Sequence, residues 1–178
     1  MPATVLIAYA TRSGSTREVA EAIAGELREA GITSELTSMR QAPTPDGYAA
    51  VMLGVPLYMG HLLKEFHRFV EDNRGALSGM PVWCFVLGPV ENKPEQFEEA
   101  RRQAEAQLAR HGWLRPIELR ILGGCWDVRR MRFPMSLLRA LPAGKVPAMD
   151  IRDWGAIRAW AREIAGHIEK HAGTAVSS

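Results

Sequence analysis

The chain has 178 residues, of which 47% are hydrophobic and 24% charged, and its formal net charge is only +2 at pH 7. This length and mix predict one globular domain with a large core, and so small a charge gives no support for nucleic-acid binding. The apolar run Val5–Ala10 is too short to span a membrane and lacks the flanks of a signal peptide, so we expect a cytoplasmic protein. Cys84 and Cys125 lie far apart and form no metal or redox motif, so we expect two buried structural thiols.

The first predicted elements are a buried strand, a short polar loop and a helix with one apolar face that ends at Gly31. The loop, residues 11–16, has the sequence TRSGST. Its hydroxyl groups and the N–H groups of a helix N-terminus suit an anion, above all a phosphate, and Gly14 lets the backbone turn closely around it. Alternatively, Ser15 caps the helix and Glu18 completes a capping box.

The composition of this loop excludes several kinds of phosphate site. It lacks the lysine and second glycine of a P-loop, the three glycines of a dinucleotide fingerprint, and the cysteine of a thiol-dependent phosphatase. What remains resembles the Thr-x-Thr/Ser-Gly-x-Thr loop by which flavodoxin-like proteins hold the phosphate of FMN. The resemblance implies a phosphate-binding role for Thr11, Arg12, Ser13, Gly14, Ser15 and Thr16.

The rest of the chain alternates strands with helices. Residues 48–55 and 81–87 are apolar on both sides, as in central strands, whereas residues 32–39 and 117–122 alternate, as in edge strands. The later helices are predicted at residues 61–73, 93–111 and 153–171. This order predicts an α/β protein: a flavodoxin-like, doubly wound, five-stranded parallel sheet in the order 2-1-3-4-5, with helices on both faces. We expect one domain over residues 1–172 and a disordered tail at 173–178.

In such a sheet a ligand binds outside the carboxyl ends of the first and third strands, where the strand order reverses. The loop after the third strand contains Tyr58, which can stack on an isoalloxazine ring or pack over its own helix. In the flavodoxin family a glycine of this loop allows a peptide flip toward the reduced ring, and Gly60 matches it. The implied ring-binding residues here are Leu57, Tyr58, Met59, Gly60 and His61. His61 either serves in proton transfer or only begins the next helix.

The loop after the fourth strand supplies a third wall for the flavin. The implied residues are Leu87, Gly88, Pro89 and Val90, which lack the tyrosine and acidic residue usual in flavodoxins. Trp126, after the fifth strand, is a candidate for the missing aromatic contact. His167 and His171 lie four residues apart without a third ligand, so we expect no metal site.

Motifs along most of the chain resemble the menaquinone-dependent protoporphyrinogen dehydrogenase family. They are residues 9–18 (YATRSGSTRE), 58–61 (YMGH), 64–70 (KEFHRFV), 78–81 (SGMP), 153–154 (DW) and 161–165 (AREIA). The resemblance implies FMN as cofactor, protoporphyrinogen IX as substrate, a quinone as electron acceptor, and an insertion here at residues 125–149. Two alternatives remain open: an electron carrier that serves a redox protein, and a module of the same fold that has lost FMN.

The predicted insertion is basic and partly apolar. Residues 115–145 contain seven basic residues and only two acidic ones. The basic residues are Arg115, Arg120, Arg129, Arg130, Arg132, Arg139 and Lys145, and the acidic ones are Glu118 and Asp127. A basic amphipathic turn at residues 129–145 suits an anionic membrane surface, the propionates of a porphyrin, or an acidic partner. It equally suits a solvated loop that covers the sheet edge.

Overall fold

The computed structural model describes residues 4–127 and 148–174. Its central sheet is parallel and contains β1 (Thr4–Tyr9), β2 (Thr33–Ser38), β3 (Ala50–Tyr58), β5 (Val82–Leu87) and β6 (Glu118–Leu122). The strand order is β2-β1-β3-β5-β6. This confirms the predicted order, with the reversal between β1 and β3.

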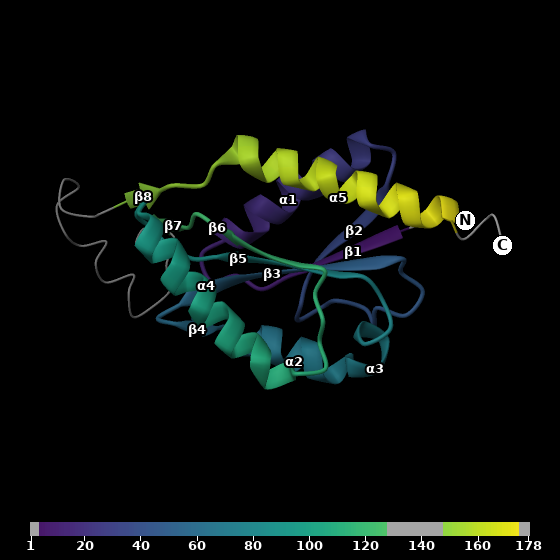
Figure 1. Ribbon diagram of the computed structural model, residues 1–178, viewed down its shortest axis with the longest axis horizontal. Helices are drawn as coiled ribbons and strands as arrows, with labels where there is room; N and C mark the ends of the chain where they lie inside the picture. Colours follow the sequence, from purple (N-terminus) through teal and green to yellow (C-terminus); the bar gives the residue numbers. More distant parts are fainter. Residues whose placement is uncertain (1–3, 128–147, 175–178) are drawn as a thin grey trace.

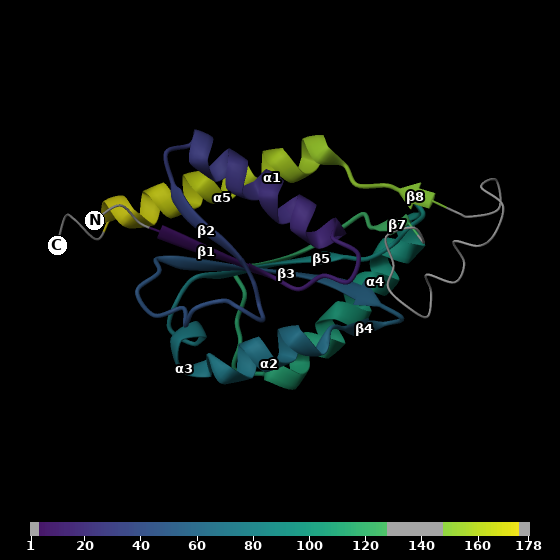
Figure 2. The same ribbon diagram turned by 180° about the vertical axis from the view of Figure 1, so that it is seen from behind.

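Helices cover both faces of the sheet. On one face lie α1 (Ser15–Glu29) and α5 (Trp154–Thr174), and on the other lie α2 (Lys64–Asp72), α3 (Arg74–Leu77) and α4 (Pro94–Leu108) (Figure 1; Figure 2 from behind). A 3-10 turn, Ala109–His111, extends α4. The predicted α/β architecture is therefore confirmed.

Strand β1 shows why its sequence is apolar on both sides. Val5 and Ile7 pack into the core under α1 and α5, whereas Leu6 and Ala8 pack into the core under α2 and α4. All four side chains are fully buried. Because successive side chains of a strand point to opposite faces, a strand covered on both faces loses the polar alternation of an edge strand.

The region after β3 differs from the prediction of a loop at 56–60 followed by a helix from His61. Strand β3 continues to Tyr58, and β4 (His61–Leu62) folds back on it as an antiparallel hairpin. Met59 and Gly60 form the two-residue turn with φ angles of 49° and 78°. Two successive positive φ angles match a hairpin turn, but Met is an unusual first residue for it. The hairpin could therefore not be predicted from the residue types of its turn. Helix α2 begins at Lys64, three residues later than predicted.

Two smaller predictions also need correction. Helix α5 runs to Thr174, three residues beyond the predicted end at His171. The rest of the tail predicted at 173–178 lies outside the described residues. Cys125 is only half-buried, since it lies in the short outlying strand β7. Cys84 is buried as expected, and burial raises the pKa of its thiol to about 12.

The two ends of the predicted insertion at 125–149 form short strands that pair with each other. Strand β7 (Cys125–Asp127) pairs antiparallel with β8 (Ala148–Asp150), beside the carboxyl ends of the main strands (Figure 1). The basic amphipathic turn predicted at 129–145 lies wholly outside the described residues. No helix within residues 4–127 and 148–174 has the length and apolar character needed to cross a membrane.

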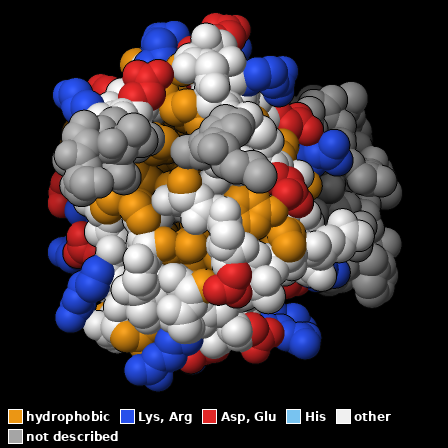
Figure 3. Space-filling model, turned by 90° about the vertical axis from the view of Figure 1, so that its right-hand side faces the viewer, with side chains coloured by type: hydrophobic (Ala, Val, Ile, Leu, Met, Phe, Trp, Pro, Cys, Tyr) orange, Lys and Arg blue, Asp and Glu red, His pale blue; other side chains and the backbone are white. Residues whose placement is uncertain are grey.

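The two ends of the sheet differ in surface. At the end where the strands begin and both termini lie, hydrophobic side chains gather within a rim of charged ones (Figure 3). Ile117, just before β6, is 48% exposed there, while Met59, at the tip of the β3–β4 hairpin, is 83% exposed at the opposite end. The candidate site lies at this opposite end, where the strands finish.

Candidate functional site

The loop between β1 and α1 forms an open turn that begins the helix. Gly14 is the N-cap residue, with a φ of 92°. Its N–H group donates to Thr11 Oγ1 at 2.9 Å, and its carbonyl accepts from the Glu18 N–H at 3.1 Å. The N–H groups of residues 15–17 therefore precede the first bond within the helix, which leaves them for another acceptor.

Thr16 tests whether this loop fits a phosphate. Its side chain is fully buried, and its hydroxyl oxygen has no hydrogen-bond partner among the described residues. Leaving a buried hydroxyl unpaired costs about 1–3 kcal/mol, so such groups usually await a partner. A Cβ at Gly14 would meet nothing within 4 Å, so the turn has open space beside it. An unpaired hydroxyl, open space and first-turn N–H groups together fit a phosphate.

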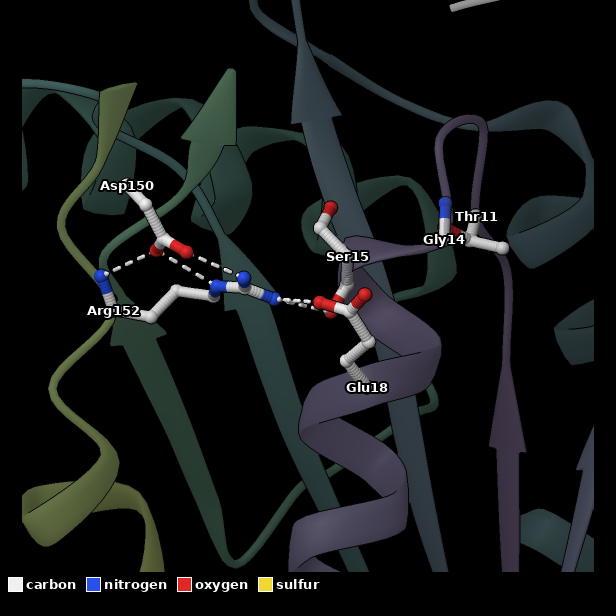
Figure 4. Close-up of polar contacts among 6 residues, drawn as sticks. All are labelled: Thr11, Gly14, Ser15, Glu18, Asp150 and Arg152. Carbon is white, nitrogen blue, oxygen red and sulfur yellow. Dashed lines mark hydrogen bonds and ion pairs between the residues drawn. The ribbon is translucent and has the colours of Figure 1, made fainter. Parts of the chain in front are cut away.

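The capping box considered from the sequence is wrong. Gly14 is the N-cap residue and has no side chain to make a capping hydrogen bond, and Ser15 is already the first helical residue. The Glu18 carboxylate turns instead toward Arg152, whose Nη1 donates to Glu18 Oε2 at 2.5 Å. Arg152 reaches Glu18 from the segment between β8 and α5 (Figure 4).

Arg152 is the main residue of this region that sequence reasoning missed. Its side chain is only 5% exposed. It donates to both carboxylate oxygens of Asp150, at 2.8 and 2.5 Å, and to the Ser15 carbonyl at 3.4 Å. It also lies over the Trp154 ring, 4.7 Å from the centroid. No motif marks this arginine, because Glu18 lies 134 positions away in the chain.

The ion pairs of Arg152 shift the acid–base equilibria of the cluster. Hydrogen bonds from Arg152 lower the pKa of Asp150, despite partial burial of the carboxyl. Hydrogen bonds to Asp150 raise the pKa of Arg152 further above its ordinary value. Arg152 is therefore a permanent cation beside the first turn of α1.

The β3–β4 hairpin brings the second predicted wall to the same end of the sheet. The Arg12 guanidinium lies over the half-buried Tyr58 ring, 4.4 Å from its centroid, and so links this wall to the phosphate loop. A flavin that stacks on Tyr58 must use the opposite face of the ring or displace Arg12. Met59 and Gly60 form the turn that joins β3 to β4.

The third predicted wall is tied to the residues that follow β6. The Gly88 N–H donates to the Leu122 carbonyl at 3.0 Å, and the Pro89 carbonyl accepts from the Gly124 N–H at 2.7 Å. Since proline has no N–H and that of Gly88 is already bonded, neither residue has a donor left for a flavin. If this wall borders the ring as predicted, Gly88 and Pro89 contact it through their shape alone, and any hydrogen bond from an N–H group among residues 88–90 must come from Val90.

A groove of about 380 Å³ joins the second and third walls to α4. Its lining residues are Leu57, Gly60, Gly88, Pro89, Glu95, Gln96, Glu99, Ala100 and Gln103. The floor is apolar and the α4 side is polar and acidic. A larger groove of about 710 Å³, along α2, shares no lining residue with the candidate site.

His61 is not the first residue of a helix, as one reading proposed, but pairs with Tyr58 in the hairpin. Gln107 Nε2 lies 3.4 Å from His61 Nδ1, and Gln107 Oε1 lies 3.2 Å from His67 Nε2. His67 Nδ1 is 2.8 Å from Nε2 of His111, whose Nδ1 is 2.5 Å from Glu71 Oε1. A chain of polar groups therefore runs from the hairpin into the α2–α4 interface.

The structure brings the three predicted walls together because they follow β1, β3 and β5, three neighbouring strands of one parallel sheet. Trp126 lies in β7, half-buried and paired with Met149. Its contact with a flavin stays a prediction.

A doubly wound sheet whose reversal point carries a loop that fits an anion is typical of flavodoxin-like proteins, the class that the strand order already indicated. A model of the flavodoxin domain matches residues 6–135, and the chain belongs to this family.

Among curated proteins, the chain is similar to the protoporphyrinogen IX dehydrogenase [quinone] of Escherichia coli. The two are 27% identical over 174 residues, which cover 93% of this chain and 96% of the relative.

Solved structures support the fold. A flavodoxin from the domain Archaea matches with a TM-score of 0.55 and 14% identity, covering 93% of this chain and 99% of that chain. Rubredoxin oxygen:oxidoreductase from Desulfovibrio gigas matches with a TM-score of 0.59 and 16% identity, covering 95% of this chain and 37% of that one.

Proposed function

We propose that this protein binds FMN and acts as an FMN-dependent oxidoreductase of the protoporphyrinogen dehydrogenase type. The observation that carries the proposal is the fully buried hydroxyl of Thr16, in the first turn after β1, which has no hydrogen-bond partner within residues 4–127 and 148–174. A hydroxyl in this place gains a strong, charge-assisted hydrogen bond only when an anion arrives. Residues 11–16 would hold the phosphate, with Thr16 and the first-turn N–H groups as the donors.

The flavin ring would lie between the other two walls. Residues 57–61 and 87–90 border the space at the carboxyl ends of β3 and β5, and Trp126 adds an aromatic side chain nearby in the sequence after β6. Tyr58 supplies a face for stacking, which contributes on the order of 1 kcal/mol beyond burial. When bound there, FMN supplies the redox chemistry, and the protein positions it.

The similarity to the Escherichia coli enzyme supports the substrate class. On this proposal a reduced substrate, a porphyrinogen, delivers electrons at the site and a quinone or another acceptor removes them. The apolar floor of the 380 Å³ groove, next to the second and third walls, offers space for a small neutral acceptor beside the ring. Contact of residues 129–145 with a membrane surface stays a prediction.

A cofactor titration and an activity assay test this proposal in sequence. The purified protein is examined for flavin absorption and titrated with FMN. Oxidation of protoporphyrinogen IX is then followed by porphyrin fluorescence, without oxygen and with an added quinone. We expect FMN binding and quinone-dependent porphyrin formation. Failure to bind FMN would overturn the whole proposal, and binding without turnover above the enzyme-free rate would overturn the enzymatic part.

A flavin electron carrier is the second candidate function, and one observation favours it. The α4 side of the groove carries Glu95 and Glu99, and Glu91 lies just before the helix. Lys93 pairs with Glu91 and Arg102 with Glu99, so these five side chains together keep a net negative charge of one, which suits docking of a basic redox protein. A carrier would exchange electrons with a reductase in a salt-dependent manner and would leave protoporphyrinogen unchanged.

A further inference from the structure

Two carboxylates lie near the loop proposed to bind the phosphate, and the basic side chains of the loop itself do not neutralise them. A phosphate monoester carries a charge of about −1.5 to −2 at neutral pH. Glu18 lies in the same first turn of α1, and Asp150 lies one arginine side chain away from it. Two carboxylates this close to a phosphate would repel it.

The basic residues of the loop and first turn are directed elsewhere. Arg12 lies over Tyr58, and Arg17 forms an exposed ion pair with Glu21 at 2.8 Å. The buried cation comes instead from Arg152, which contacts Glu18, Asp150 and the carbonyl of Ser15. Ser15 is itself a residue of the phosphate loop, so the guanidinium touches the loop directly.

We propose that Arg152 is a positioning residue for the cofactor phosphate: it neutralises Glu18 and Asp150 and fixes the first turn of α1 in a form that accepts an anion. This inference rests on the proposed FMN site. Because Arg152 is only 5% exposed, solvent screens its interactions less than those of a surface pair. The same contacts join the base of the β7–β8 hairpin to the phosphate loop, since Asp150 is the last residue of β8.

The test compares the binding of FMN and riboflavin, which differ only by the phosphate. Both are titrated into the full-length protein and the Arg152→Gln variant by flavin fluorescence quenching. We expect the Kd for FMN to rise by roughly tenfold or more, equivalent to at least ~1.4 kcal/mol, while the Kd for riboflavin changes less than about twofold. The matched control is Arg158→Gln, which removes the exposed arginine that lies 3.5 Å from Glu26 at the α1–α5 interface. This control should leave both affinities unchanged.

A second substitution separates charge from scaffolding. In the Arg152→Gln background, Glu18→Gln removes one of the two carboxylates that have lost their contact with Arg152, and we expect it to recover much of the lost FMN affinity. Glu18→Gln alone should tighten FMN binding by a few fold, because Arg152 then keeps more net positive charge near the loop.

The outcomes are distinct. Equal weakening of FMN and riboflavin, or no recovery on adding Glu18→Gln, would show that Arg152 only supports the local fold and would overturn the inference. If Arg152→Gln does not fold, judged by its circular dichroism, Glu18→Gln alone carries the test, and unchanged FMN binding would then overturn the inference. If the unaltered protein binds neither ligand, it is the proposed function that fails.

Discussion

The candidate site has one end for the phosphate and one for the ring, and the two differ in whether their polar groups already have partners within the protein. The phosphate end, residues 11–18 with Arg152, keeps a buried hydroxyl at Thr16 without a partner among the described residues. The ring end, the β3–β4 hairpin with residues 88–90, already uses its own groups: Arg12 covers Tyr58, and the Gly88 N–H bonds to Leu122. We therefore expect polar donors to recognise the phosphate, and shape and stacking to be the main means of recognising the ring.

Removing the unpaired hydroxyl is the most direct way to break this contrast. Thr16→Val keeps the side-chain shape and should raise the Kd for FMN roughly 10- to 150-fold, since a hydrogen bond to a charged group contributes about 1.5–3 kcal/mol. Riboflavin binding should hardly change. Without ligand the variant should be at least as stable as the parent in urea unfolding, because a buried orphan hydroxyl is gone. Thr33→Val, at the exposed start of β2, is the control, and an unstable Thr16→Val would contradict our assignment.

At the ring end, crowding the third wall should affect stability. A Cβ at Gly124 would lie 2.9 Å from the Gly88 carbonyl oxygen and 3.1 Å from that of Pro89. Gly124→Ala should therefore reduce the free energy of unfolding by about 1–3 kcal/mol, because backbone must move. Gly112→Ala, whose Cβ would meet its nearest neighbour at 3.8 Å, should be close to neutral. Urea unfolding of both variants measures the difference, and equal midpoints would refute it.

A pair of identical substitutions in and beside α1 sharpens the description of the phosphate turn. Gly14 has a φ of 92°, whereas Gly25 lies within the helix, and neither Cβ would meet an atom within 4 Å. Gly14→Ala should destabilise the protein by roughly 1–2 kcal/mol through backbone strain. Gly25→Ala should stabilise it by about 0.5–1 kcal/mol. Effects of the same sign in thermal unfolding would mean that the turn is not held in the left-handed conformation.

The two ends should also respond to acid in different pH ranges. Burial, His111 and Arg110 lower the pKa of His67 below its ordinary value of 6.5, against Glu71 and the hydrogen bond to Gln107. The folded state then holds fewer protons than the unfolded one, so stability is full above pH 6.5 and declines as pH falls toward the lowered pKa.

Asp150, at the phosphate side, has a pKa below its ordinary 3.8, so its contribution is lost only in stronger acid. Urea midpoints between pH 7.5 and 5 should therefore fall in the parent protein and fall less in His67→Gln. An unchanged slope in that variant would contradict the role of His67.

Local patterns in the sequence determined the sheet and the phosphate loop. The double-sided apolarity of β1, β3 and β5 against the alternation of β2 and β6 predicted which strands are central and which lie at the edges, because burial on one or both faces leaves its own period. The strand order of the structure fits that pattern. Residues 11–16 were recognisable because a phosphate loop is contiguous, and its donors lie within one turn of a helix. The insertion at 125–149 stays a prediction, and of it the structure describes only the region of the paired strands β7 and β8.

Tertiary structure alone decided the partners of these local elements. Arg152 and Glu18 are 134 positions apart, and His67 and His111 are 44 apart, so no spacing rule could pair them. The β3–β4 hairpin was missed because Met59 adopts a positive φ that its residue type does not favour, and the cross-strand pairing supports it. Sequence periodicity reports which face of an element is buried, whereas ion pairs and strained turns depend on which elements the finished fold places side by side.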